Sequence, residues 1–305
     1  MRSSVISEIQ KRKSGAASSG TKLGLVIEGG GMRGVYSGGA LKALADLGLS
    51  AAFDAIFAES AGAINACYFL SNQVDLGLSI YVEDLTSLRF FNPLRLGSVL
   101  DIGFLIEEIV AKRKPLDIVK VLASRTHLHV ALTNARDGSP HMIDTRITPH
   151  SLLTILRATA VMVPLYNEPV LLDGVPYVDG GISNPLPILS AMEAGCTHIL
   201  VLLTRPRSFR IREFSARQQT VLERMLKRWP TPFRQALLHH RVQLYKQARA
   251  LAFEESDLYP NVKITVIEPG PDSPKISRVT RSAPALRAAI EDAQRRTHRL
   301  FRAEK

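Results

Sequence analysis

The chain has 305 residues, of which 46% are hydrophobic and 22% are charged, and it carries a formal net charge of +11. This balance excludes a disordered chain and allows one large α/β domain, or two ordinary ones, with a substantial core. The two cysteines, Cys67 and Cys196, lie far apart and show no metal-ligand spacing, so we expect neither a disulfide framework nor a cysteine metal site.

The N-terminal segment 1–21 is rich in serine and lysine and has no continuous apolar core. It does not match a cleavable secretory signal, and we expect a flexible tail. The longest apolar runs, such as Ile199–Leu203, are strand-sized and far shorter than the ~20 residues of a transmembrane helix. We therefore expect a cytoplasmic protein without a transmembrane helix, with at most peripheral contact with a membrane.

The first elements after this tail alternate between strand and helix. A buried strand is predicted over 23–27, followed by a glycine-rich turn and by a helix that begins near Val35 and ends before Gly48. A second short strand over 54–58 leads directly into a helix over 61–70. Strand, helix, strand and helix in so short a span are typical of a mostly parallel α/β sheet.

The middle of the chain continues this pattern after a mainly helical stretch over 72–120. The further predicted elements are strands at 127–133 and 141–144, a helix at 151–160, a strand at 175–178, a helix at 186–194 and a strand at 198–203. The sequence thus predicts one α/β domain over 22–204, in which helices flank a mostly parallel central sheet.

The basic charge is concentrated after this domain. Residues 205–305 contain 22 of the 39 lysines and arginines but only 10 of the 28 acidic residues. We expect a mainly helical extension that packs on the same domain, with one further strand over 262–267 and a final helix from near Ser282. Either solvated helix faces or an anionic partner such as a membrane explains the charge. No aromatic-interleaved basic motif accompanies it, so no nucleic-acid partner is expected.

Three short segments carry the chemistry, and the first is the glycine-rich run from Gly29 to Gly34 between the first strand and its helix. Glycines at such a place let backbone N–H groups point into a cavity beside the positive end of a helix. The N–H groups bind either a phosphate or the oxyanion of an acyl-transfer transition state. The spacing also satisfies G-x-G-x-x-G, the dinucleotide-binding fingerprint, which alone is weak evidence.

The second segment, Ala58-Glu59-Ser60-Ala61-Gly62, lies directly after a short strand and directly before a helix. This is the context of a nucleophile elbow, in which a sharp turn exposes a serine hydroxyl and small flanking residues let the backbone approach. A helix cap at Ser60 is the simpler alternative.

The third segment, Val178-Asp179-Gly180-Gly181, ends a strand at the edge where open α/β sheets bind ligands. An Asp-Gly turn is common in any protein, so this segment alone decides nothing.

Together the three segments resemble the patatin-like phospholipase family, to which the segment Arg157–Pro164 is also similar, and the resemblance covers roughly residues 22–203. It implies a three-layer α/β sandwich and a lipid acyl hydrolase in which Ser60 attacks a carboxylic ester and Asp179 acts as the general base without a histidine. It also implies phospholipids or other acyl esters as substrates, with no metal and no cofactor. The implied oxyanion hole comprises Gly29, Gly30, Gly31, Arg33 and Gly34, and the implied supporting positions are Ala58, Gly62, Gly180 and Gly181.

Two positions depart from the family pattern. Ala58 replaces a glycine of the elbow, and Glu59 stands where a small or hydroxylic residue is usual. These departures keep open a catalytically degenerate scaffold that binds lipid without turnover. A nucleotide- or dinucleotide-binding module is the other alternative, because Glu59 ends the second strand, where an acid could bind a ribose.

Overall fold

The apolar segments of the sequence form the strands of one eight-stranded sheet in the computed structural model, which describes residues 4–16, 18–95, 98–253 and 258–302. The strands are β1 (Leu23–Ile27), β2 (Ala55–Ala58), β3 (His127–Asn134), β4 (Pro140–Asp144), β5 (Val170–Leu172), β6 (Val175–Asp179), β7 (His198–Leu202) and β8 (Lys263–Ile267). Their order across the sheet is β5-β6-β3-β2-β1-β7-β8, and β4 pairs with β3 outside this path.

The centre of the sheet is parallel. β1 lies between β2 and β7, with Leu25 opposite both Ile56 and Leu200. β3 and β8 extend the parallel arrangement on either side, whereas β4, β5 and β6 pair in antiparallel fashion. The predicted mostly parallel sheet is therefore confirmed. β5 is not predicted, because three residues carry too little alternation to indicate a strand.

Eleven α-helices are described, together with shorter helical turns. The α-helices are α1 (Ser4–Lys13), α2 (Gly34–Asp46), α3 (Ala61–Leu70), α4 (Val74–Ser79), α5 (Ile118–Ala123), α6 (Leu152–Thr159), α7 (Ile188–Glu193), α8 (Ala216–Met225), α9 (Thr231–Gln235), α10 (Arg241–Phe253) and α11 (Ala283–Arg302). Two 3-10 turns, η1 (Gly31–Arg33) and η4 (Gly180–Ile182), and three π-helical segments, η2 (Ile80–Asp84), η3 (Phe104–Arg113) and η5 (Ala236–His240), complete the described helical structure.

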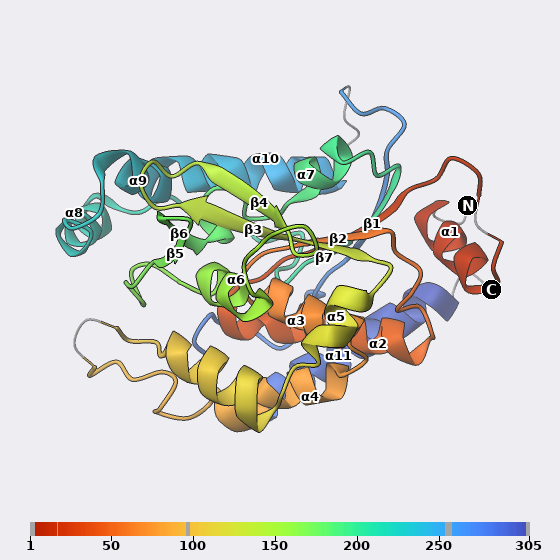
Figure 1. The fold of residues 1–305 in the computed structure, drawn as a ribbon, viewed down its shortest axis with the longest axis horizontal. Coiled ribbons are helices and arrows are strands. Elements are labelled where there is room, and N and C mark those ends of the chain that lie inside the picture. The colour runs from red at the N-terminus through yellow and green to blue at the C-terminus, as the bar shows by residue number, and fades with distance from the viewer. Residues whose placement is uncertain (1–3, 17, 96–97, 254–257, 303–305) are drawn as a thin grey trace.

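Helices cover both faces of the sheet, so the fold has three layers (Figure 1). α2, α3 and α11 lie on one face, where Leu25 and Ile27 of β1 belong to the larger apolar core. α7 and α10 lie on the opposite face, where Val26 packs in a second apolar core with Ile188 of α7. Alternate side chains of the same strand thus enter different cores, as the geometry of a strand requires. The predicted α/β sandwich is confirmed.

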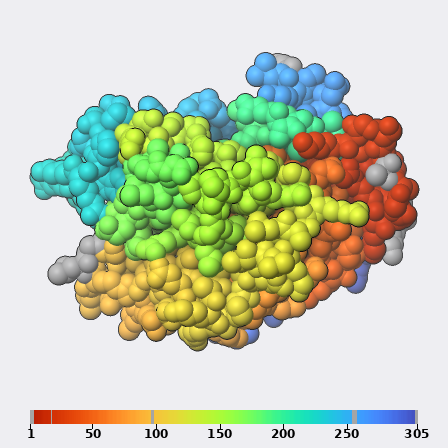
Figure 2. All heavy atoms as spheres, viewed as in Figure 1, coloured from red at the N-terminus to blue at the C-terminus, as the bar shows by residue number. Residues whose placement is uncertain are grey.

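The N-terminal segment does not form a tail over the residues that are described. Residues 4–13 form α1, and the side chains of Val5, Ile6 and Ile9 are completely buried. Figure 2 shows this red segment packed against the rest of the molecule. The prediction of a flexible tail is therefore wrong for residues 4–13, which form this packed helix. The serine and lysine residues that suggested a tail surround one apolar helix face, which is buried against the sheet.

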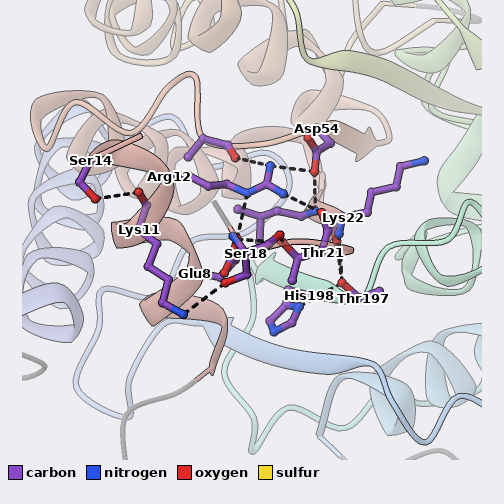
Figure 3. Close-up of polar contacts among 12 residues, drawn as sticks. Glu8, Lys11, Arg12, Ser14, Ser18, Thr21, Lys22, Asp54, Thr197 and His198 are labelled. Atoms are coloured by element: carbon purple, nitrogen blue, oxygen red, sulfur yellow. Dashed lines mark hydrogen bonds and ion pairs between the residues drawn. The ribbon is translucent and has the colours of Figure 1, made fainter. Parts of the chain in front are cut away.

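A polar network provides a second anchor for α1. Arg12 Nη1 pairs with Asp54 Oδ2 at 2.8 Å, and Glu8 Oε1 accepts hydrogen bonds from Ser18 and Thr21 (Figure 3). Burial alone would raise the pKa of Glu8, but the hydrogen bonds from Ser18, Thr21 and Arg12 outweigh it and lower the pKa from 4.5 to about 2. This network therefore stabilises the fold at neutral pH, and its contribution is lost as the pH falls through about 2.

We expect Ile6→Ala to lower the free energy of unfolding by about 2–5 kcal/mol, because it leaves a cavity under α1. Urea unfolding followed by circular dichroism measures the change. Lys13→Ala, at an exposed position of the same helix, is the control and should change the value by less than about 0.5 kcal/mol. An unchanged unfolding midpoint for Ile6→Ala would mean that α1 is detached in solution.

The basic C-terminal third contributes to the sheet and to its covering layer. β8 adds a parallel edge strand next to β7. α11 approaches α2 so closely that a Cβ atom on Gly39 would lie 2.6 Å from the carbonyl oxygen of Ile290. α8 has no buried residue and projects at the left edge of Figure 2. Of the helices that are described, none combines the length and the apolar composition of a membrane span.

Candidate active site

Ser60 occupies a strained turn between β2 and α3. Its φ of 53° and ψ of −133° lie in a region that residues other than glycine rarely adopt. The side chain makes no capping hydrogen bond to α3, so Ser60 is not the simple helix cap considered above. The Ser60 N–H donates to Thr159 Oγ1 at 2.8 Å, which fixes the turn against the end of α6. This is the geometry of a nucleophile elbow.

Asp179 lies at the end of β6, against Ser60. Its Oδ1 accepts a hydrogen bond from the Gly181 N–H at 2.7 Å, and the neighbouring Ser60 side chain opposes the rise in the pKa of Asp179 that burial causes. Both residues are buried, with exposed fractions of 3% for Ser60 and 7% for Asp179. Water therefore competes little for this contact, which joins the two residues that the sequence paired as nucleophile and base.

The glycines beside both residues are required by close backbone packing. A Cβ atom on Gly62 would lie 2.6 Å from the carbonyl oxygen of Ile27, and one on Gly180 would collide with the carbonyl group of Ala131. Real Cβ atoms essentially never approach other atoms within 3.0 Å. The start of α3 thus packs directly against β1, and η4 packs directly against β3. These contacts hold the Ser60 turn and the Asp179 turn in place. Ala58 is completely buried, so the fold accommodates its methyl group.

The loop between β1 and α2 offers two free N–H groups. The backbone φ is 129° at Gly30 and 61° at Gly31, values that favour glycine. Within the described ranges, the N–H groups of Gly30 and Gly31 donate to no protein acceptor. Gly31 lines the same cavity as Ser60. These two N–H groups are available to a ligand beside the nucleophile.

Two other glycines predicted for the oxyanion hole have different roles. The Gly29 N–H donates to Glu59 Oε1 at 2.7 Å, and the Gly34 N–H donates to the carbonyl groups of Gly31 and Met32 in η1. Both N–H groups are thus engaged by protein acceptors and are not free to bind an oxyanion in this arrangement. Gly34 is instead a packing position, since a Cβ atom there would collide with the Tyr81 hydroxyl.

Glu59 points inward, between the glycine loop and Asp179, and is 4% exposed. Burial, with the negative charge of Asp179 as the second cause, raises the pKa of Glu59 well above its usual value. Burial also raises the pKa of Asp179, but hydrogen bonds from Gly181 and Ser60 oppose this effect. Of the pair, Glu59 therefore keeps the proton and donates it to Asp179 in a hydrogen bond. Burial thus favours the protonated, neutral form of the unusual acid beside the nucleophile, and the hydrogen bond from the Gly181 N–H favours an ionised carboxylate at Asp179.

Glu59→Gln is expected to stabilise the fold at alkaline pH, by an amount that grows with pH. Because the pKa of Glu59 is raised, the folded protein holds a proton that the unfolded chain releases above about pH 4.5. Wild-type stability therefore falls as the pH rises from that value to the folded-state pKa, and glutamine removes this loss. Urea unfolding of both proteins at about pH 5 and pH 8 measures the difference. A difference independent of pH would mean that Glu59 is ionised in the fold.

An apolar pocket lies beside Ser60, between α3 and the π-helical segments η2 and η3. Its walls are mainly aliphatic and aromatic side chains, and one backbone segment of the glycine loop reaches it. The lining includes Gly31, Ser60, Ile64, Ile80, Tyr81, Leu85, Phe90, Leu100, Ile102, Leu105 and Met162. A pocket of this composition that ends at a serine hydroxyl can hold an acyl chain.

A second, strongly basic pocket lies on the Asp179 side of the site. Four arginines line it, and they are Arg33, Arg205, Arg241 and Arg278. Of these, only Arg33 is among the residues predicted from the sequence. The other three belong to the basic C-terminal third, where the charge excess is visible in the sequence but the direction of each side chain is not. Arg278 and Met162 line both pockets, so the two pockets adjoin.

One group of side chains within the described ranges could hold a metal ion, and it lies apart from both pockets. The ligand atoms of His127, His129 and Asp144, on β3 and β4, lie within 4.8 Å of one another. None of these three lines either pocket, and neither does any other histidine that the structure describes. The pair formed by Ser60 and Asp179 therefore has no imidazole beside it.

Comparison with known proteins agrees with this geometry. Residues 25–192 match the patatin-like phospholipase family. The protein YjjU of Escherichia coli (strain K12), described as uncharacterized, is 29% identical over 191 residues, which make up 61% of this chain and 52% of that protein. Patatin-like phospholipase domain-containing protein 4 of Homo sapiens is 37% identical over 68 residues, or 22% of this chain and 26% of that protein.

Among solved structures, VipD from Legionella pneumophila matches with a TM-score of 0.48 and 13% identity, over 94% of this chain and 68% of that chain. The matches to the two curated relatives span about half of the first protein and about a quarter of the second. The family match, in contrast, takes in more than half of this chain and includes the glycine loop, the elbow and the Asp179 segment. The chain therefore belongs to the patatin-like phospholipase family.

Proposed function

We propose that this chain is a serine hydrolase that cleaves carboxylic esters of lipids, with Ser60 as the nucleophile and Asp179 as the general base. The observation that carries the proposal is the position of Ser60, at a strained turn between a strand and a helix and next to the buried Asp179 carboxyl group. A hydroxyl is a weak nucleophile until an adjacent base takes its proton, and Asp179 is the base in contact with it.

In the first half of the reaction, Ser60 Oγ attacks the ester carbonyl while Asp179 accepts the hydroxyl proton. Asp179 then passes this proton to the departing alcohol, which leaves an acyl group on Ser60. In the second half, Asp179 takes a proton from water, the hydroxide attacks the acyl group, and the fatty acid is released. The proton returns to Ser60 at the end of the cycle, so Asp179 is ionised again.

The free N–H groups of Gly30 and Gly31 are proposed as the oxyanion hole. Each half of the reaction passes through a tetrahedral intermediate with a negative oxygen, and one well-placed donor typically lowers such a barrier by ~3–4 kcal/mol. Because the Gly29 N–H already donates to Glu59, the proposed oxyanion hole comprises only the amides of Gly30 and Gly31. The Arg33 side chain lies against Gly30 and adds positive charge to the same region.

Two features favour a lipid ester over a nucleotide. The apolar pocket beside Ser60 fits an acyl chain, because most of its lining side chains are aliphatic or aromatic. Glu59, the acid that a dinucleotide site would use for the ribose, is buried and hydrogen-bonded to Gly29 and Asp179. The G-x-G-x-x-G spacing is thus better explained by the oxyanion loop.

Peripheral binding to an anionic membrane forms part of the proposal, with α8 as the contact. α8 has no buried residue and exposes Val221 and Met225 beside Arg224, a combination typical of interfacial helices. Each basic side chain near an anionic surface contributes ~1 kcal/mol of attraction.

We expect binding of this protein to anionic vesicles to weaken as the salt concentration rises, and to weaken further in Met225→Asp. Binding that depends on neither would contradict this contact.

The proposal is tested by turnover of p-nitrophenyl esters of increasing chain length, combined with labelling by a fluorophosphonate probe. The expected result is hydrolysis that improves with chain length, because longer acyl chains fill the apolar pocket, and a single label that peptide mass spectrometry assigns to Ser60. Absence of both turnover and labelling would overturn the proposal and favour the degenerate lipid-binding scaffold that Ala58 and Glu59 suggest.

A further inference from the structure

The four arginines of the basic pocket come from four separate parts of the chain. Arg33 ends η1, Arg205 follows β7, Arg241 begins α10, and Arg278 lies in the connection from β8 to α11. Each is partly buried, and all face the same cavity. The four arginines are therefore brought together by the tertiary fold, and they do not form the exposed basic face of a single helix.

These arginines have no anionic partner and no hydrogen-bond acceptor among the residues that the structure describes. Within the described ranges, none of the four forms an ion pair within 4.0 Å or donates a side-chain hydrogen bond. The Nε atoms of Arg33 and Arg241 are shielded from solvent and have no acceptor. Burial of an unpaired cation is costly, so natural proteins retain such groups where a ligand supplies the missing charge.

Mutual repulsion adds to this cost. Burial, followed by the positive charges of Arg205 and Arg278, lowers the pKa of Arg33 to about 9. Burial, followed by the same two arginines, lowers the pKa of Arg241 to about 10. Arg205 is held in place by the rings of Phe209 and Tyr245, which lie 4.4 and 4.9 Å from its guanidinium carbon. The aromatic rings therefore hold the Arg205 guanidinium group in the pocket, close enough to Arg33 and Arg241 to lower their pKa values.

The carboxyl groups in the same wall do not neutralise the pocket. Glu28 accepts hydrogen bonds from the Thr204 N–H and the Tyr245 hydroxyl, and Glu59 and Asp179 hydrogen-bond to each other. Four guanidinium groups face three carboxyl groups, so one net positive charge remains even if every carboxyl group is ionised. When Glu59 and Asp179 share a proton, the net charge is two, which matches a dianion.

We propose that the basic pocket binds the phosphomonoester head group of an acyl-ester substrate, as in lysophosphatidic acid. This inference rests on the proposed function and names its substrate class. Guanidinium groups bind phosphate oxygens through paired hydrogen bonds, and a phosphomonoester is a dianion near neutral pH. Ser60 lines the apolar pocket and Asp179 the basic one, with Arg278 shared between them. A lipid with its acyl chain in one pocket and its phosphate in the other therefore places its ester bond at the nucleophile.

The test compares three oleoyl esters that differ only in their head group: lysophosphatidic acid, lysophosphatidylcholine and monooleoylglycerol. We expect wild-type kcat/KM to be at least about tenfold higher for lysophosphatidic acid than for the other two. Arg241→Gln, and independently Arg205→Gln, should reduce this ratio at least about tenfold. Arg299→Gln, at an exposed position of α11 outside the pocket, should leave the ratio unchanged. Equal ratios in all four proteins would overturn the proposal.

Calorimetric titration separates this proposal from the proposed function. If no ester is turned over, binding of lysophosphatidic acid that weakens at least about tenfold in Arg241→Gln still supports the pocket, while the hydrolase is ruled out. In the other case, the enzyme hydrolyses esters without a head-group preference, and Arg241→Gln binds lysophosphatidic acid as tightly as the wild type does. The proposed hydrolase function then stands, and the assignment of the basic pocket fails.

Inorganic phosphate is titrated in parallel. Phosphate that binds as tightly as the lipid would show recognition of a free anion and would overturn the head-group assignment.

Discussion

Replacing Asp179 by asparagine is expected to lower kcat/KM for every ester that the wild type hydrolyses by at least about 10³-fold. The asparagine amide cannot take the proton from the Ser60 hydroxyl, so Ser60 remains a weak nucleophile. The oxygen at position 179 can still accept from the Gly181 N–H, which keeps the turn in place. Ser60→Ala should cause a loss of similar size. Because the two side chains act as a unit, the double variant should be no slower than either single variant.

Asp173→Asn is the matched control, since the Asp173 side chain is 79% exposed and lies outside both pockets. Its kcat/KM should equal that of the wild type. Urea unfolding at neutral pH distinguishes lost chemistry from lost structure. Burial raises the pKa of Asp179, so ionisation of this group costs stability in the fold, and Asp179→Asn should be at least as stable as the wild type. An inactive Ser60→Ala beside a fully active Asp179→Asn would assign the base to another residue.

Gly180→Ala is expected to lower kcat/KM at least about 10²-fold and the free energy of unfolding by about 1–3 kcal/mol. The added methyl group would collide with the carbonyl group of Ala131, so η4 must move away from β3. Asp179 immediately precedes this turn, and its movement would break the contact with Ser60. Ester turnover and urea unfolding of the same preparation measure the two effects together.

Gly103→Ala is the control for this substitution. Gly103 has a helical φ of −59°, and a Cβ atom there would meet its nearest neighbour, Asp101 Oδ1, at 3.5 Å. Activity should be unchanged, and stability should stay the same or rise by up to ~1 kcal/mol. If Gly180→Ala behaves in the same way, the backbone contact with β3 does not position Asp179.

The strands and the elbow can be predicted because their signals are local. The run from Leu23 to Ile27 is apolar throughout, and both of its faces are covered in the fold. The serine segment stands between a strand and a helix, which is sufficient to predict the turn. The pairing of Ser60 with Asp179 follows from the family resemblance of the three chemical segments taken together, although the two residues lie 119 positions apart in the sequence.

What could not be predicted depends on tertiary contacts. The apolar spacing of Val5, Ile6 and Ile9 suits a helix, but such a short helix forms only because it packs against β7 and β8. The hydrogen bond from the Gly29 N–H to Glu59 depends on the distance between two loops, and this distance cannot be derived from the sequence. The basic pocket forms because four arginines that are distant in the sequence point inward. A count of charges shows which part of the chain is basic, but it does not show which way each side chain points.

The packing of α11 on α2 has a consequence for the synthesis of this protein. Gly39 meets the backbone of Ile290, a residue that is added roughly 250 positions later in the chain. At ordinary elongation rates, α2 therefore leaves the ribosome roughly 10–50 s before its covering helix exists. β8 and Arg278 are also translated late. The nascent chain thus carries the glycine loop and Ser60 long before it can complete the cavity around them, so the proposed ester hydrolysis should begin only after β8, Arg278 and α11 have been synthesised.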